Sequence, residues 1–231
     1  MKIPGLIGGI GPESTIEYYR QIIAAYRQQT GDGSYPELLV NSINMKKMLD
    51  LIGANELEAV TDYLLKEVYR LEQAGANFGA LASNTPHLVF EALSARAPIP
   101  LISIVETACD AAKALEMHRV GLFGTRFTMQ GRFYPEVFQR KGITLATPAP
   151  DEQTYIHDKY MGELVNGIIR EETRTHLLAI ASRMKAEDGI EGLILGGTEL
   201  PLILGNVRIG MPLLDTTCIH VERIVAEMLA D

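Results

Sequence analysis

The sequence contains only two cysteines among 231 residues, too few for a disulfide framework in a chain of this length. It also has no apolar run near the ~18–20 residues that a membrane span requires. The first residues lack the basic, apolar and small-residue parts of a signal peptide. We therefore expect a protein of the reduced cytoplasm that has no membrane partner.

Positive charge is also scarce. The formal net charge is −8, and no basic cluster exceeds Lys46-Lys47, so the electrostatic footprint of a nucleic-acid-binding protein is missing. The histidines are scattered without ligand spacing, which predicts no metal site. Because an acidic chain repels anions at long range, an anionic substrate would need a local cation or a helix N-terminus.

Short apolar runs alternate with longer segments of helical periodicity. Apolar runs of this kind are typical of strands buried on both faces of a parallel sheet. The expected strands are residues 3–7, 38–43, 78–82, 101–104, 120–123, 142–145, 192–195 and 212–214. The expected helices are residues 16–29, 55–74, 108–115, 131–140, 154–185 (with one break) and 217–229. This alternation predicts an α/β fold with mostly parallel sheets flanked by helices.

The chain also contains an internal repeat. Residues 5–8 and 121–124 match in type at an offset of 121 − 5 = 116, and residues 78–85 resemble 191–199 at an offset of 198 − 83 = 115. Two segments at nearly one offset predict two pseudo-symmetric lobes, an N-terminal lobe of 1–100 plus 210–231 and a C-terminal lobe of 101–209. The ligand site would lie in the cleft between them, at the carboxyl ends of the strands. Such segments also occur in unrelated α/β proteins, so coincidence is the alternative explanation.

A glycine-rich loop at residues 8–14 leads into the first expected helix. A dinucleotide fingerprint is excluded because its third glycine is missing and Pro12 interrupts the loop, and a P-loop is excluded because Gly-Lys-Ser/Thr is absent. The backbone amides around Ile10 are suited to a carboxylate at a helix N-terminus. A simple left-handed turn is the alternative.

Three further polar loops follow expected strands. Residues 83–87 place a hydroxyl, an amide, a second hydroxyl and an imidazole together, which is more than a helix cap needs. Residues 196–201 are the counterpart in the other lobe, and the segment with Thr125 and Thr128 corresponds to the glycine-rich loop. Four such loops facing one cleft predict a site for a small molecule.

These motifs together resemble the aspartate/glutamate racemase family. The matching segments are residues 5–15, 84–87, 121–125 with 128–129, 157–164, 197–201 and 214–217, in family order over essentially the whole chain. The resemblance implies two Rossmann-like lobes, a homodimer and catalysis without pyridoxal phosphate, metal or any other cofactor. It implies that Ser83 and Thr198 face each other across the α-carbon of the substrate, where one residue removes the proton and the other returns one.

The resemblance also implies the residues that bind the substrate. Asn84, Thr85 and the amides near Ile10 would hold its carboxylates. Thr125, Thr128 and Glu199 belong to the loops of the same pocket. Lys159 is the candidate cation for a carboxylate, and a solvated helix lysine is the alternative.

Hydroxyls stand at both positions where the family places its catalytic cysteines. A thiol titrates near pKa ~8.5 and an aliphatic hydroxyl roughly five units higher, which corresponds to about 7 kcal/mol of extra stabilisation. A neighbouring base, His87 or Glu199, could offset this difference. Cys109 and Cys218 are expected to be ordinary buried residues.

Three functions are therefore open. The first is racemisation or epimerisation of an aspartate- or glutamate-type amino acid. The second is a lyase or isomerase reaction on a small dicarboxylate in the same pocket. The third is carboxylate binding without catalysis.

Overall fold

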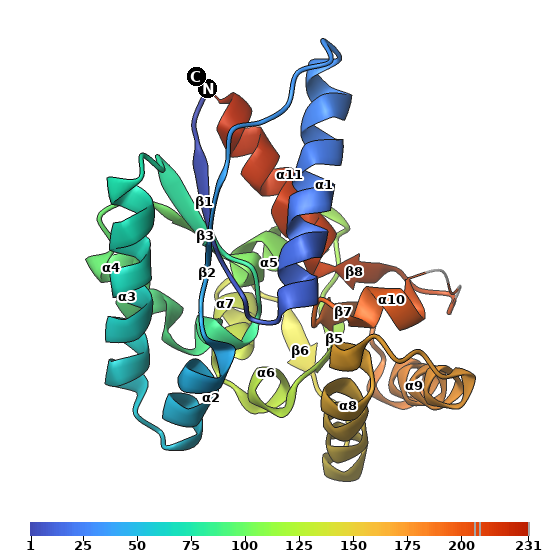
Figure 1. The fold of residues 1–231 in the computed structure, drawn as a ribbon. Helices are drawn as coiled ribbons and strands as arrows, with labels where there is room; N and C mark the ends of the chain where they lie inside the picture. Colours follow the sequence, from blue (N-terminus) through green and yellow to red (C-terminus); the bar gives the residue numbers. More distant parts are fainter. Residues whose placement is uncertain (206, 208, 231) are drawn as a thin grey trace. The chain divides into compact units, whose positions relative to one another are not determined.

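A computed structural model describes residues 1–205, 207 and 209–230, which form two compact units. The first unit is Met1–Ile104 with His220–Asp231, and the second is Val105–Ile219. Each contains a four-stranded parallel sheet flanked by helices (Figure 1). Among the described residues, no helix is both long and apolar enough to cross a membrane.

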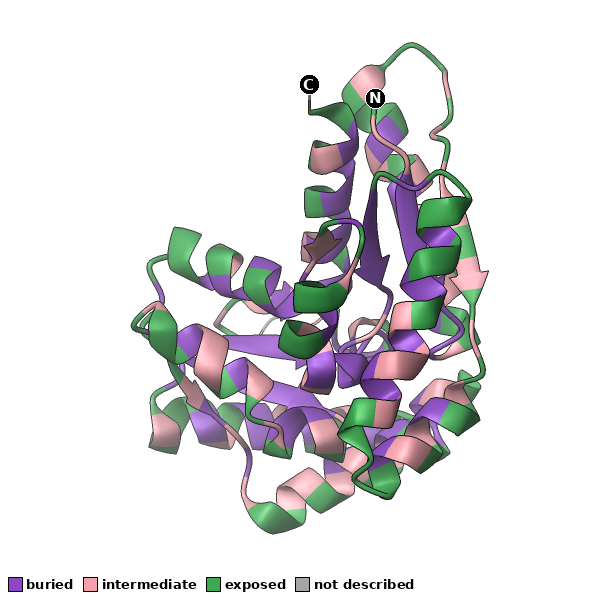
Figure 2. Cartoon of the chain, turned by 90° about the vertical axis from the view of Figure 1, so that its left-hand side faces the viewer, coloured by how far each residue is buried: buried purple, intermediate pink, exposed green. Residues whose placement is uncertain are grey.

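The first unit has the strand order β2-β1-β3-β4. Its strands are β1 (Pro4–Gly8), β2 (Leu39–Ser42), β3 (Phe78–Leu81) and β4 (Leu101–Ile102). Its helices are α1 (Pro12–Thr30), α2 (Met45–Gly53), α3 (Leu57–Gln73), the 3-10 helix η1 (Thr85–Val89) and α4 (Phe90–Arg96), and α11 (Thr216–Leu229) enters this unit at His220. Apolar side chains of β1, β3, α1 and α11 form its core. The strands β1 and β3 are buried along their whole length (Figure 2).

The second unit repeats this arrangement in the strand order β6-β5-β7-β8. Its strands are β5 (Arg119–Gly124), β6 (Thr144–Ala146), β7 (Gly192–Gly196) and β8 (Leu213–Asp215). Its helices are α5 (Ile104–Ala114), α6 (Arg126–Gln130), α7 (Phe133–Arg140), α8 (Pro150–Gly162), η2 (Leu164–Asn166), α9 (Glu171–Arg183), η3 (Met184–Asp188) and α10 (Leu200–Leu204). Side chains of β7, α8, α9 and α10 share its core.

Strand register relates the two units residue by residue. Ile7 of β1 pairs with Leu81 of β3, and Phe123 of β5 pairs with Leu195 of β7. Ile7 and Phe123 occupy equivalent positions in the sequence repeat, at an offset of 123 − 7 = 116. Their strand partners Leu81 and Leu195 are therefore equivalent too, and the offset between β3 and β7 is 195 − 81 = 114. The offset of 115 predicted from the loops is therefore wrong by one residue. The register equivalent of Ser83 is residue 83 + 114, which is Gly197, and Thr198 lies one position further on.

A backbone hydrogen bond of the residue just before β3, and of the residue just before β7, supports this register. Asn77 N–H donates to the Ile3 carbonyl at 2.8 Å, and Glu191 N–H donates to the Arg119 carbonyl at the same distance. The donors differ by 191 − 77 = 114 and the acceptors by 119 − 3 = 116.

The predicted α/β class and all eight expected strands are confirmed. The expected segment 154–185 is α8 followed by α9, with the break between them, whereas α2, α4, α6 and α10 were not expected. Two of the expected lobe bounds differ from the units. Residues 101–104 fall in the first unit, where β4 pairs with β3, and residues 210–219 fall in the second, where β8 pairs with β7.

Candidate functional site

The glycine-rich loop of the first unit is fastened to the end of β3. Gly9 has φ +78°, and a Cβ there would lie 2.5 Å from the Ile43 carbonyl oxygen, so both conformation and space require glycine. Its N–H donates to Thr15 Oγ1 at 2.8 Å. The Ser14 hydroxyl donates to the carbonyl of Ala82 at 2.7 Å. The loop and the first turn of α1 are thereby held beside Ser83, with Pro12 in that first turn as expected.

The second polar loop of this unit places Ser83 directly after β3. Ser83 is half-buried, whereas Asn84 and Thr85 are buried. The short helix η1 begins at Thr85, with Pro86 in its first turn. The two residues predicted to bind a carboxylate therefore follow Ser83 directly in the chain and are both buried.

His87 does not act on the Ser83 hydroxyl. Its Nε2 accepts the N–H of Ile104 at 3.2 Å, so Nδ1 carries the proton and donates to the Ser83 carbonyl oxygen at 3.1 Å. Its ring stacks on Phe90. Burial, together with the nearby His220, lowers the pKa of His87 to about 3. The imidazole is thus neutral and hydrogen-bonded to backbone through both nitrogens. Its role is to stabilise the conformation of the loop.

The polar loop of the second unit is different. The Thr198 hydroxyl donates to Glu199 Oε2 at 2.7 Å, and the phenol of Tyr160, from α8, donates to the same oxygen. All three side chains are buried, with exposures of 8% for Thr198, 3% for Glu199 and 6% for Tyr160. Burial, and then the Glu199 carboxylate, raises the pKa of Tyr160 well above its ordinary value. The Glu199 carboxylate, which accepts both hydrogen bonds, and the Tyr160 phenol, which stays protonated, therefore lie beside the predicted hydroxyl of Thr198.

Gly197 makes room for this arrangement. A Cβ on Gly197 would lie 2.4 Å from Cε2 and 2.7 Å from the phenol oxygen of Tyr160. Tyr160 was not among the residues predicted from the sequence, because it lies far from the loop along the chain. The one signal for it was a second glycine directly before Thr198.

Thr125 and Thr128 form a local cap. Thr125 is the N-cap of α6, and its hydroxyl accepts the N–H of Thr128 at 3.3 Å and lies 3.2 Å from the Thr128 hydroxyl. Thr128 is fully buried against Gly124 and Gly196. This gives Thr128 a structural role, and substrate contact by either threonine stays a prediction.

Lys159 is engaged with its own helix. Its ammonium bonds Glu163 Oε1 at 2.7 Å, and this ion pair raises the pKa of Lys159. The other carboxylate oxygen of Glu163 accepts the Thr173 hydroxyl at 2.6 Å. The geometry is closer to that of a solvated helix lysine than to a free cation, and binding of a substrate carboxylate stays a prediction.

The two cysteines lie outside these loops. Cys109 is buried as expected, and burial raises its pKa to about 11. Cys218 is exposed, contrary to expectation, and its N–H bonds the Asp215 carboxylate that caps α11. In the described part of the chain, no group of three His, Cys, Asp or Glu side chains could hold a metal ion.

Two equivalent parallel sheets, each with a polar loop after its β3 or β7 strand, define a two-lobed α/β fold, and the family match places the protein in the isomerase class. The chain belongs to the Asp/Glu/Hydantoin racemase family, whose family model matches residues 7–224. It is 25% identical over 237 residues to the broad specificity amino-acid racemase RacX of Bacillus subtilis (strain 168), covering 98% of both chains.

Solved structures agree with this assignment. An Asp/Glu racemase candidate from Yersinia pestis has a TM-score of 0.92 and 30% identity, with all of both chains covered. An aspartate racemase homologue from Pyrococcus horikoshii OT3 has a TM-score of 0.87 and 31% identity, also over all of both chains.

Proposed function

We propose that the chain is a cofactor-independent racemase of an aspartate- or glutamate-type amino acid, acting as a cytoplasmic homodimer. Membership of the racemase family and the name of the Bacillus subtilis relative support an amino acid as substrate. In this proposal both polar loops take part in the reaction. Asn84, Thr85 and the amides around Ile10 hold the carboxylates of the substrate, aided by the N-terminus of α1.

The observation that carries the proposal is the buried hydrogen bond from Thr198 to Glu199 Oε2. Breaking the α-C–H bond leaves its electron pair delocalised into the substrate carboxylate, and the proton must go to a base. Glu199 takes it directly, or Thr198 takes it while passing its own proton to Glu199. No free alkoxide forms on either route, which avoids the cost of about 7 kcal/mol that an unaided hydroxyl would face.

A carboxylate in place of a thiolate as the base should slow proton removal. An ordinary carboxylate is weaker than a thiolate by about four pKa units, which is roughly 6 kcal/mol of driving force for proton removal. We therefore expect slower turnover than a two-thiol site would give. On the opposite face Ser83 lacks a base in its own loop, because His87 is bound to backbone, so it passes protons only between water and the substrate.

This asymmetry favours one second candidate, a reaction that needs a single base. A lyase or isomerase acting on a small dicarboxylate would use Glu199 and leave Ser83 as a hydrogen-bond donor. The same residues without turnover would make a carboxylate-binding protein.

Incubation in deuterated water separates the three functions. Each enantiomer of aspartate and glutamate is incubated with the protein, with NMR to follow α-hydrogen exchange and chiral chromatography to follow inversion. Racemisation predicts both signals, reduced in Ser83→Ala and Thr198→Val but not in the matched controls Ser182→Ala and Thr154→Val on exposed helix positions. Binding without exchange of any of these amino acids would refute the racemase. Product from dicarboxylates without amino-acid exchange would favour the one-base reaction.

A further inference from the structure

We infer that Tyr160 is the positioning residue of this site, with its ring in the space of a side chain at residue 197 and its phenol holding Glu199 as the proton acceptor. The inference rests on the proposed function, since it assigns the base of the same reaction. It shifts the acid/base role in the second unit from the Thr198 hydroxyl to the pair formed by Tyr160 and Glu199.

Strand register is the first step. The residue that follows β7 at the place where Ser83 follows β3 is Gly197, which brings no functional group. A side chain there would start within 2.4 Å of the Tyr160 ring, so the ring already fills that space. A phenol from α8, 2.7 Å from the place of that Cβ, therefore lies at the register position of Ser83.

Hydrogen bonding is the second step. Glu199 Oε2 accepts from both Tyr160 and Thr198, so this oxygen acts as an acceptor toward two donors, as expected of an ionised carboxylate. In a buried setting, two such bonds fix the carboxyl group in one orientation. Both ring nitrogens of His87 are bound to backbone, whereas the donors to this oxygen in the described part of the chain are side-chain hydroxyls.

Proton balance follows from this arrangement. Glu199 accepts the α-proton and becomes neutral, while the electron pair of the broken C–H bond passes into the substrate carboxylate. Tyr160 keeps its own proton throughout, because burial and the adjacent carboxylate raise its pKa. In racemisation the Ser83 hydroxyl gives a proton to the opposite face of the α-carbon and regains one from water, while Glu199 releases the abstracted proton to water. Water is therefore the one co-reactant, and protons and electrons balance.

The pH dependence of α-hydrogen exchange tests the inference. Glu199→Gln should lower the exchange rate about 10²–10⁴-fold, the contribution typical of a general base. Tyr160→Phe removes a donor that favours the ionised carboxylate, so the acidic limb of the pH–rate profile should move to higher pH by about one unit. Tyr155→Phe, on the same helix and outside the pair, should leave both rate and profile unchanged.

A purely structural role for Tyr160 would lower the rate without moving the acidic limb, and that result would overturn the inference. Wild-type exchange rates in Glu199→Gln would overturn it too. If Tyr160→Phe does not fold, Gly197→Ala gives the same test, because it displaces the ring instead of removing its hydroxyl.

A 5-substituted hydantoin distinguishes failure of the inference from failure of the proposed function, because its ring C–H is more acidic than that of an amino acid. Exchange of the hydantoin alone, lost in Glu199→Gln and pH-shifted in Tyr160→Phe, would keep the pair and reject the amino-acid substrate. Exchange of amino acids that is insensitive to both substitutions would keep the amino-acid substrate and reject the pair of Tyr160 and Glu199. Exchange of neither compound would reject both.

Discussion

The Ser83 loop and the Thr198 loop follow equivalent strands of two equivalent sheets but hold different chemistry. The basic group near Ser83 is His87, and both of its nitrogens are bound by backbone. The basic group near Thr198 is Glu199, and among the described residues its Oε2 accepts from the hydroxyls of Thr198 and Tyr160. The repeated sheet thus determines where a functional loop lies, whereas the partners of each side chain determine what it can do.

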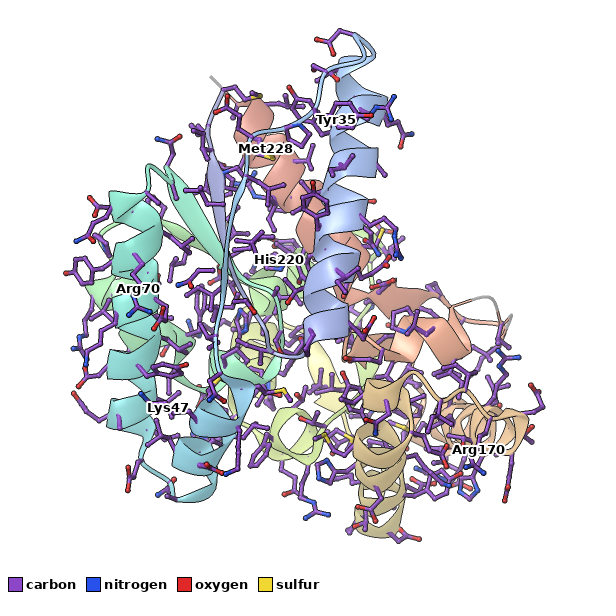
Figure 3. The ribbon with its side chains drawn as sticks, in the orientation of Figure 1. Tyr35, Lys47, Arg70, Arg170, His220 and Met228 are labelled. Carbon is purple, nitrogen blue, oxygen red and sulfur yellow. The ribbon has the colours of Figure 1, made fainter. Side chains whose placement is uncertain are left out.

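Acidification should affect the first unit most. Burial lowers the pKa of His220 to about 4, and burial with His220 lowers that of His87 to about 3. Both values lie below the unfolded value of about 6.5, so the unfolded chain binds more protons and stability falls as pH drops from 6.5. His220, marked on α11 in Figure 3, should contribute a loss of about 3 kcal/mol by pH 4, and His87 adds to it.

Urea unfolding between pH 7.5 and 4.5 measures this effect. His220→Gln should be less stable at neutral pH, because it disturbs the bonds to Tyr18 and the Ile102 carbonyl, but its stability should vary less with pH. A mutant that keeps the slope of the wild type would exclude His220 as the source.

Enlarging Gly197 should disturb the second unit. Gly197→Ala pushes a methyl group into the Tyr160 ring, and overpacking of this kind costs about 1–3 kcal/mol. The free energy of unfolding in urea measures it, with Gly162→Ala on α8 as control, because nothing lies within 4 Å of a Cβ there. Equal stability of the two variants would mean that the ring is not held against Gly197.

A thiol at residue 83 should raise the rate of inversion, because the Ser83 loop has no base of its own. Ser83→Cys supplies a group whose ordinary pKa is roughly five units lower than that of the hydroxyl, so we expect inversion of aspartate or glutamate to rise at least about tenfold. Chiral chromatography measures inversion, and Ser83→Ala controls for loss of the hydroxyl. An unchanged rate in Ser83→Cys would show that residue 83 is not the limiting side of the site.

The smallest effect is expected at Lys159. Its ammonium is paired with Glu163, so Lys159→Met should change KM by less than about threefold, as is usual for a partly exposed ion pair. Steady-state kinetics with aspartate and glutamate measure this. A large rise in KM at unchanged kcat would instead support Lys159 as the carboxylate-binding cation.

The sequence was sufficient for the α/β class and for the strands, because buried parallel strands are continuous apolar runs between glycines and prolines. It was insufficient for short helices such as α6 and α10, whose five residues are too few for a periodic pattern. Both loops were found because polar residues concentrate after buried strands.

The pairing of Ser83 with Thr198 was wrong by one position because it came from the similarity of two sequence segments, whereas strand register is set by backbone pairing. Similarly, the sequence could name His87 and Glu199 as candidate bases but could not choose between them. That choice depends on Ile104 and Tyr160, which are distant along the chain and close only in the folded units.

The ratio of α-deuterium incorporation to inversion in the wild-type protein tests most directly whether the base lies in the Thr198 loop. If Glu199 removes the proton and Ser83 returns one only from water, one enantiomer of the substrate should gain deuterium with retention faster than it inverts. Equal incorporation from both enantiomers, with one deuterium for each inversion, would contradict this account and show that the two loops are equally competent.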